Sequence, residues 1–267
     1  MAILALQSAS SGLSSLNTQL DVIANNLANV NTQGYKASRA NFQDLLYIER
    51  SQPGVENAIG DQRPTGLYVG LGVKVSGTQQ DFSQGAPIFT GRELDVAIRG
   101  DGFFKVTIDP DLGNTGYTRA GNFSLNSDGE LVMANDQGRR LDPNITIPDD
   151  AISIDISPDG AVFVLQPGDN QPQEVGQIEL ATFVNSAGLK QIGENLWVET
   201  AASGAPIEGE PGTENRGTLL QNNLEASNVD PTRELVELIR TQRAFEMNSQ
   251  SIRAADETLR SVGQLRR

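Results

Sequence analysis

The run Ala24-Asn25-Asn26-Leu27-Ala28-Asn29-Val30-Asn31-Thr32-Gln33-Gly34-Tyr35-Lys36 ends the first periodic segment of the chain. Apolar residues before and within it are spaced alternately by three and four positions: Leu6, Ala9, Leu13, Leu16, Leu20, Ile23, Leu27 and Val30. An average spacing of about 3.5 residues is typical of a coiled-coil seam. Asp21 is the only charged residue before Lys36, so the remaining faces can be enclosed by protein without burying charge. The sequence therefore predicts a helix that packs on other helices and stops near Gly34.

The C-terminal segment has the same spacing. Asp230 is expected to cap a helix that has Pro231 in its first position. The apolar seam then continues through Leu235, Leu238, Phe245, Ile252, Ala255, Leu259 and Val262. Thr241 and Asn248 occupy intervening seam positions, where polar residues usually fix register. Two such helices at opposite termini predict an antiparallel pair, with the rest of the chain inserted between them.

Composition narrows the possible partners. The 267 residues carry a formal net charge of −14, and almost all of it lies between the two terminal segments. Nucleic acid is not an expected partner, because phosphate binding needs a basic surface. The sequence contains neither cysteine nor histidine, which excludes disulfides, thiol chemistry and histidine-based catalysis.

No stretch approaches about 18 consecutive apolar residues, so membrane insertion is not expected. The first residues lack the basic region of a cleaved signal peptide. If the protein leaves the cytosol, we expect a route that exports an uncleaved chain.

The middle of the chain is rich in strand and turn signals. Residues 37–47 are expected to continue as helix, and Val69, Leu71, Val73 and Val75 alternate with glycine and other residues as in a strand. From about residue 84, Asp-Gly pairs and other turn residues separate short β-prone runs. This pattern predicts an all-β domain, either a sandwich or a barrel.

The expected fold is therefore mixed α and β, with terminal antiparallel coiled-coil helices that enclose an inserted all-β domain. The expected division has four parts: a helical inner domain at 1–36 and 224–267, a connecting region with an extended hairpin-like segment at 37–83, an outer β-domain at 84–215, and a return connector at 216–223.

The sequence offers weak candidates for chemistry. Asp109 with Asp111, and Asp149 with Asp150, are close carboxylate pairs, but further calcium ligands at fixed spacing are missing. Gly100-Asp101-Gly102 is too short for a dinucleotide-binding loop and does not open a helix. We expect no catalytic, cofactor-binding or metal-binding residues.

Both terminal motifs, however, resemble a known family. Ala24, Asn25, Asn26, Ala28 and Asn29, with Thr32, Gly34, Tyr35 and Lys36, resemble the N-terminal signature of bacterial flagellar rod and hook proteins. Residues 227–230 and 242–248 resemble the C-terminal signature, and residues 98–104 and 193–196 resemble the middle of these proteins. The resemblance covers the chain end to end.

The resemblance implies a non-enzymatic, structural subunit that assembles itself into the distal rod, the drive shaft that transmits torque from motor to hook. Its implied partners are further copies of itself, the proximal rod proteins, the hook protein, the P and L ring proteins and the flagellar type III export apparatus. Its implied location is the rod of the basal body, which crosses the periplasm. The implied assembly seam comprises Leu6, Leu13, Leu16, Leu20, Ile23, Leu27, Val30, Leu238, Phe245, Ile252 and Leu259.

The segment from Tyr47 to Val73 distinguishes the chain from hook proteins, and we expect it to stiffen the rod. Its key residues are Gln52, Pro53, Gly54, Pro64, Val69, Leu71 and Val73. Two alternatives stay open at this point. One is another flagellar rod or hook protein, and the other is a secreted β-domain that binds or acts on carbohydrate.

Overall fold

The computed structural model describes residues 2–54, 64–168 and 171–265, which form two compact units. The helix-hairpin unit comprises Met1–Ala28, Ser38–Gln80 and Asp230–Arg267, and the β-unit comprises Asn29–Ala37 and Asp81–Val229. The predicted mixture of two terminal helices and a β-rich middle is confirmed, and the two helices contact each other.

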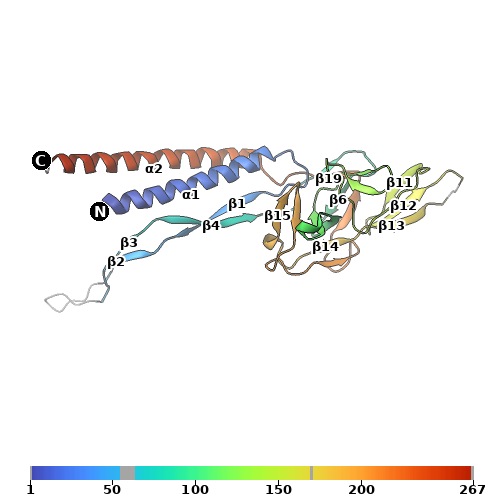
Figure 1. Ribbon diagram of the computed structural model, residues 1–267, viewed down its shortest axis with the longest axis horizontal. Coiled ribbons are helices and arrows are strands. Elements are labelled where there is room, and N and C mark those ends of the chain that lie inside the picture. Colours follow the sequence, from blue (N-terminus) through green and yellow to red (C-terminus); the bar gives the residue numbers. More distant parts are fainter. Residues whose placement is uncertain (1, 55–63, 169–170, 266–267) are drawn as a thin grey trace. The chain divides into compact units, whose positions relative to one another are not determined.

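The two long helices are α1 (Ala2–Ala28) and α2 (Pro231–Leu265), and they lie along each other in opposite directions (Figure 1). Asn248 near the end of the chain donates to the carbonyl of Ala9 near its beginning, which fits an antiparallel pair. The predicted cap of α2 is confirmed, because the backbone N–H groups of Thr232 and Arg233 donate to Oδ1 of Asp230 at 2.9 and 3.3 Å.

Helix α1 ends at Ala28, before the stop that was predicted near Gly34. Beyond it, Asn29 closes a local turn: its carbonyl accepts from the backbone N–H of Thr32 at 3.1 Å, and its side chain accepts from the Thr32 hydroxyl at 3.0 Å. Such short polar side chains compete with helical hydrogen bonding. The second half of the N-terminal motif therefore lies outside the helix and belongs to the β-unit.

The prediction of helix over residues 37–47 is wrong. Strand β1 (Ser38–Asp44) pairs antiparallel with β4 (Val73–Gln80), and β2 (Tyr47–Ser51) pairs antiparallel with β3 (Leu67–Gly70). Strand β1 pairs with residues that lie 29 (Asp44 with Val73) to 42 (Ser38 with Gln80) positions later in the chain, and this pairing, which the local apolar pattern does not reveal, decides the conformation. The alternating run from Val69 to Val75 forms two strands, β3 and β4, separated at Gly72, whose φ is +118°.

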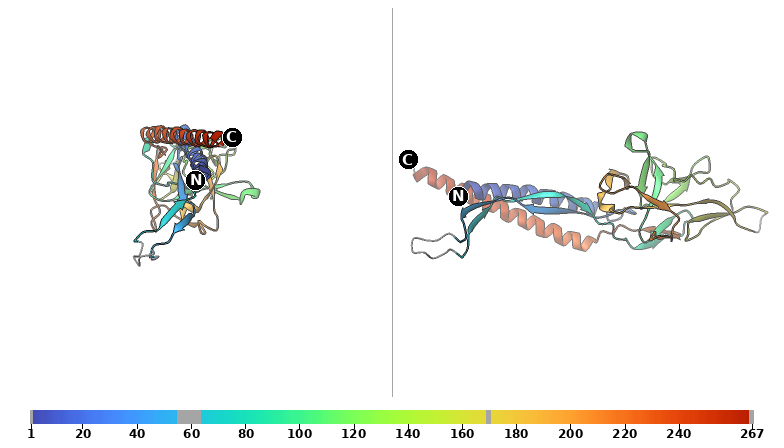
Figure 2. Two further views of the ribbon diagram at one scale, coloured as in Figure 1. Left: turned by 90° about the vertical axis from the view of Figure 1, so that its left-hand side faces the viewer. Right: turned by 90° about the horizontal axis from the view of Figure 1, so that it is seen from below.

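The ribbon of β1 and β4 lies against α1 (Figure 2). Gly72 comes so close to the helix that a Cβ at this position would collide with the side chain of Ser11. The Ser11 hydroxyl oxygen also accepts from the Val73 backbone N–H at 3.3 Å. Gly72 therefore permits a close approach between this strand and the helix.

The described residues of the β-unit form one six-stranded antiparallel sheet, one three-stranded sheet and three two-stranded ribbons. The large sheet has the order β15-β16-β8-β7-β14-β17, and its strands are β7 (Phe103–Thr107), β8 (Thr115–Thr118), β14 (Leu180–Thr182), β15 (Lys190–Gly193), β16 (Leu196–Val198) and β17 (Ile207–Gly209). The three-stranded sheet is β11 (Ser153–Ile156), β12 (Ala161–Leu165) and β13 (Gln173–Gln177). The ribbons pair β5 (Pro87–Phe89) with β19 (Asn223–Glu225), β6 (Val96–Arg99) with β18 (Thr218–Gln221), and β9 (Phe123–Leu125) with β10 (Leu131–Met133). Two short 3-10 helices, Pro110–Leu112 and Ser186–Gly188, lie between strands.

The turn signals had different outcomes. Asp128-Gly129 joins the paired strands β9 and β10, and Asp159-Gly160 joins β11 and β12, so these hairpins are confirmed. The strands on either side of Gly100-Asp101-Gly102 do not pair with each other, because β6 pairs with β18 while β7 pairs with β8 and β14. The sheets of the described residues do not close into a barrel.

The core of the β-unit has two apolar clusters. The larger contains Val96, Ile98, Phe104, Phe123, Leu131 and Leu180 among its most deeply buried members. The smaller is mainly aromatic and contains Phe103, Tyr117 and Trp197, with Phe82 and Phe183 packed against it. The β-unit thus buries enough apolar surface to fold around its own core.

Candidate assembly surfaces

The two helices have a fixed register. The Asn248 side chain donates from Nδ2 to the carbonyl oxygen of Ala9 at 3.1 Å, and a Cβ on Gly12 would lie 2.5 Å from the same Nδ2. Gly12 therefore makes the space in which Asn248 reaches the α1 backbone. A polar seam residue specifies register because sliding the helices would bury its amide without a partner.

Most predicted seam residues are partly covered within the chain. Ile23 is buried, and the half-buried members are Leu6, Leu13, Leu16, Leu20, Leu27, Leu238, Phe245 and Ile252. Val30 is also half-buried but lies beyond the helix, in the β-unit. The side chain of Leu259 lies outside the described residues. That these residues pack against neighbouring copies stays a prediction.

Helix α2 has a second apolar surface, most of which lies outside the predicted seam. Leu235, Val236, Ile239 and Met247 are 47%, 44%, 48% and 62% exposed. We call these four residues the outer face of α2. Only Leu235 was placed in the predicted seam, because a two-position heptad rule assigns the others to solvent. A search for a wider apolar stripe would have found them.

Asn26 explains part of the N-terminal motif. Its Nδ2 donates to the Ser38 carbonyl at 2.8 Å, and its Oδ1 accepts from the Ser38 backbone N–H at 2.9 Å. Its amide thereby pairs with strand β1 much as a backbone would. The Asn26 side chain also hydrogen-bonds Glu234 on α2. A 2% exposed amide thus joins three elements of the helix-hairpin unit, whereas Ala24, Asn25 and Ala28 are exposed.

Burial affects the carboxyl of Glu234. Desolvation raises its pKa above the ordinary value, and the hydrogen bond from Asn26 opposes that rise. Ionisation of Glu234 therefore costs more free energy in the folded helix pair than in the unfolded chain.

Gly34 and Lys36, from the second half of the motif, meet the C-terminal segment inside the β-unit. Gly34, at φ +68°, donates its N–H to the Glu225 carbonyl at 2.8 Å, and a Cβ there would lie 2.7 Å from the Ala120 nitrogen. Lys36 Nζ lies 2.7 Å from both Glu225 Oε1 and the Ser83 carbonyl. Arg119 is 3.5 Å from the other Glu225 oxygen. Lys36, Glu225 and Arg119 form what we call the buried ion cluster.

Every side chain of the buried ion cluster is at most 2% exposed. Burial lowers the pKa of Lys36, and the carboxylate of Glu225 opposes the shift. Glu225 Oε1 also accepts from the Gly85 backbone N–H at 2.8 Å. A charged side chain costs free energy when it is buried without a partner of opposite charge. The cluster therefore holds the motif and the C-terminal segment together.

Asn228 makes a second connection between the two ends. Its Oδ1 accepts from the Ala37 backbone N–H at 2.7 Å, and its Nδ2 donates to the Asp81 carbonyl at 2.7 Å. Residues of both terminal signatures thus satisfy each other's polar groups. Tyr35 is buried beside them, and Thr32 is half-buried.

The predicted stiffening segment is a β-ribbon where it is described. Val69, Leu71 and Val73 are half-buried, whereas Gln52, Pro53, Gly54 and Pro64 are exposed. Large apolar side chains of the ribbon face solvent, including Leu46 at 82%, Tyr47 at 58% and Leu67 at 55% exposure. Residues 55–63 of the predicted segment lie outside the described residues.

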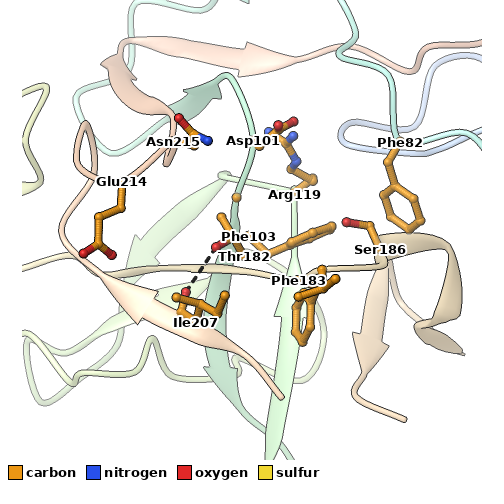
Figure 3. A pocket seen from close by; sticks show the side chains of 12 residues that line it. Phe82, Asp101, Phe103, Arg119, Thr182, Phe183, Ser186, Ile207, Glu214 and Asn215 are labelled. Carbon is orange, nitrogen blue, oxygen red and sulfur yellow. Dashed lines mark hydrogen bonds between the residues drawn. The ribbon is translucent and has the colours of Figure 1, made fainter. Parts of the chain in front are cut away.

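The β-unit also carries a pocket of about 440 Å³ (Figure 3). Phe82, Phe103 and Phe183 form its aromatic wall, with ring centroids 5.5 Å apart for the first pair and 5.9 Å for Phe103 and Phe183. The guanidinium of Arg119 lies 5.5 Å from the Phe103 ring centre. Val184 and Ile207 line the pocket with exposures of 85% and 48%, and Asp101, Glu214 and Asn215 add polar groups.

Two further properties concern the described residues. Neither helix there is both long and apolar enough to cross a bilayer. In the same part of the chain, Asp and Glu residues nowhere form a group of three or more that could hold a metal ion.

Comparisons with known proteins find flagellar proteins along almost the whole chain. Three family models match: "Flagella basal body rod protein" at residues 6–36, "Flagellar hook protein FlgE/F/G D1 domain" at 97–164 and "Flagellar basal body rod FlgEFG protein C-terminal" at 220–265. The flagellar basal-body rod protein FlgG of Caulobacter vibrioides is 47% identical over 98% of this chain and 99% of its own length. That of Borreliella burgdorferi is 45% identical over 98% of both chains. The Escherichia coli hook protein FlgE is 26% identical over 98% of this chain.

Proposed function

Since the chain belongs to the flagellar basal-body rod protein FlgG family and is a structural subunit of the distal rod, we propose that it polymerises helically through its terminal helices. The rod so formed is a drive shaft that passes torque from the motor to the hook. The subunit catalyses no reaction in this role. The hook alternative is disfavoured by the lower identity to FlgE, and the carbohydrate alternative by similarity over 98% of the chain.

The solvent exposure of the outer face of α2 is the observation that supports this proposal most directly. Its side chains are roughly half exposed or more, although three of them are large and branched. Burying one such side chain contributes about 1.5–3 kcal/mol. A surface of this kind on a long helix is typical of an interface. Neighbouring copies cover it, and the seam residues then form a coiled coil between and within subunits.

The charge distribution supports an arrangement in layers. The helix-hairpin unit has 11 acidic and 11 basic residues, whereas the β-unit has 23 acidic and 9 basic residues, a net charge of −14. Neutral units can pack closely around a common axis, whereas strongly acidic ones favour solvent. We place the helices in an inner layer, the ribbon of β1 to β4 in a connecting layer and the sheets outside.

The exposed apolar residues of the ribbon support a stiffening role. Leu46, Tyr47 and Leu67 lie on strands or beside them, so neighbouring copies can bury them and resist sliding. A shaft that turns inside bushings needs this resistance, whereas a hook must bend. Contacts outside the helices therefore set the bending stiffness of the filament.

Further partners follow from this place in the flagellum. The subunit contacts proximal rod proteins at one end of the rod and the hook protein at the other, and the P and L ring proteins surround it. It crosses the periplasm as part of the rod and reaches that site through the type III export apparatus. It binds neither nucleic acid nor membrane in this role.

Electron microscopy of the purified full chain at rising concentration tests the proposal. Filaments are expected above a threshold concentration. Ile239→Asp on the outer face of α2 raises that threshold, because assembly would bury an unpaired carboxylate. Ile152→Asp is the matched control, since Ile152 is 64% exposed and lies in the β-unit. Equal thresholds for the two variants contradict assembly through α2.

A further inference from the structure

The pocket beside Phe103 has the features of a receptor for an aromatic side chain. Phe82, Phe103 and Phe183 contact one another edge to face, with interplanar angles of 77° and 67°. Such rings favour a further ring placed in the same manner. The volume of about 440 Å³ exceeds the need of a single side chain, so a neighbouring residue can enter with the ring. Figure 3 shows Phe82 and Phe183 projecting on the same side as Phe103.

Strand β5 of the same unit presents a matching side chain. Phe89 is 74% exposed, and the adjacent Ile88 is 52% exposed. Among the described residues of the β-unit, Phe89 is the only aromatic residue among the large apolar side chains that face solvent. Strand β5 pairs only with β19 among the described strands, and all three of its residues are exposed.

Charge complementarity favours this pairing. Two copies of a unit with net charge −14 repel each other unless local contacts compensate. Arg92 follows Phe89 closely in the chain; its side chain is 58% exposed, and its Nη1 lies 3.6 Å from the buried carboxylate of Asp95. The pocket presents the carboxylates of Asp101 and Glu214; Glu214 is 75% exposed and also accepts from Arg216 at 3.1 Å. Ile152, another exposed apolar residue, follows Asp149 and Asp150 and would bring like charges together.

From these observations we infer that the pocket receives Phe89 from a second copy of this chain, with Arg92 facing Glu214. The inference rests on the proposed polymerisation and adds a specific contact between β-units. The two surfaces are different parts of one subunit, so the contact is heterologous. Repetition of such a contact produces a helical filament where the rotation between copies does not close a ring, and it does not produce a two-fold symmetric dimer.

The absence of cysteine from the sequence allows a direct test with the full chain. One variant carries Phe89→Cys and a second carries Ser186→Cys, where Ser186 lines the pocket. The two are mixed, assembled and oxidised, and the products are separated without reductant. A disulfide-linked dimer is expected from the mixture and not from either variant alone.

The matched control replaces Phe89→Cys by Ile152→Cys, which has similar exposure. Filaments without a cross-link, or equal cross-linking with Ile152→Cys, overturn the inference while leaving polymerisation intact. A dimer from Phe89→Cys alone also overturns it, because that product shows a symmetric contact. Failure of the parent chain to form filaments refutes the proposed function instead.

A second measurement avoids cysteine chemistry. Phe89→Ala is expected to raise the threshold for polymerisation by about 10- to 100-fold, as loss of a buried aromatic contact implies. Ile152→Ala leaves the threshold unchanged, and both variants melt like the parent because both side chains are exposed. An unchanged threshold for Phe89→Ala contradicts the contact.

Discussion

Replacing Lys36 by Met tests whether the buried ion cluster holds the two ends of the chain together. Met has similar length and fills similar space, but it cannot donate to Glu225 or to the Ser83 carbonyl, each now 2.7 Å from Lys36 Nζ. The variant leaves a carboxylate that is 1% exposed without its closest cation.

Breaking one partner of a buried pair costs about 3–5 kcal/mol. Glu225 keeps the Gly85 N–H at 2.8 Å and Arg119 at 3.5 Å, which favours the lower end of that range. With a urea dependence of about 2 kcal/mol per molar, a loss of about 3 kcal/mol lowers the unfolding midpoint by about 1.5 M.

The fluorescence of Trp197 can be used to measure unfolding. Trp197 is the only tryptophan, lies in the β-unit and is 2% exposed, so its fluorescence reports the unfolding of this unit. Lys190→Met is the control, because Lys190 is exposed and its replacement should change stability by at most about 0.5 kcal/mol.

A second substitution, Glu225→Gln, completes a double-mutant cycle. We expect the double variant to lose less stability than the two single losses combined, because the residues interact directly. If Lys36→Met unfolds at the same urea concentration as Lys190→Met, the cluster does not anchor the motif. Strict additivity in the cycle would equally refute the interaction.

Three further outcomes are expected. Leu20→Asp puts a carboxylate at a half-buried seam position, so filaments should be lost in electron micrographs while Trp197 still reports cooperative unfolding; normal filaments would exclude the seam from assembly. Deleting residues 50–64 should leave polymerisation intact but shorten the persistence length of the filaments, and an unchanged persistence length would assign stiffness elsewhere. Glu234 has a raised folded-state pKa, so the helix pair should gain stability as pH falls through that value towards the unfolded value near 4.5. Glu234→Gln should remove this dependence from the helical circular dichroism during thermal unfolding, and its persistence in the variant would contradict the assignment.

Local rules explain what the sequence could predict. The cap at Asp230 and the hairpins at Asp128-Gly129 and Asp159-Gly160 involve residues within a few positions of each other, and all three are confirmed. The spacing of apolar residues likewise sufficed to predict two terminal helices. In each case the free energy that decides the conformation comes from neighbours in the chain.

Non-local pairing explains what the sequence could not predict. Residues 37–47 resembled a helix because Phe42, Leu45 and Leu46 have helical spacing, yet β1 within this segment pairs with β4, which begins at Val73. Lys36 and Glu225 are 189 positions apart, and no local pattern relates them. The pocket likewise combines residues from Phe82 to Asn215. Such contacts depend on topology, which periodicity alone does not determine.

The N-terminal and C-terminal signatures nevertheless occur together, and the contacts between them give a physical reason. Asn26 hydrogen-bonds Glu234 on α2, Asn228 completes the hydrogen bonding of Ala37, and Lys36 neutralises the carboxylate of Glu225. Each is a polar group that becomes costly when its partner is removed, so substitution at one end penalises the other. Such a motif requires particular residues at its positions although none of them takes part in a reaction. Its specificity comes from the need to satisfy buried polar groups between segments that lie at opposite ends of the chain.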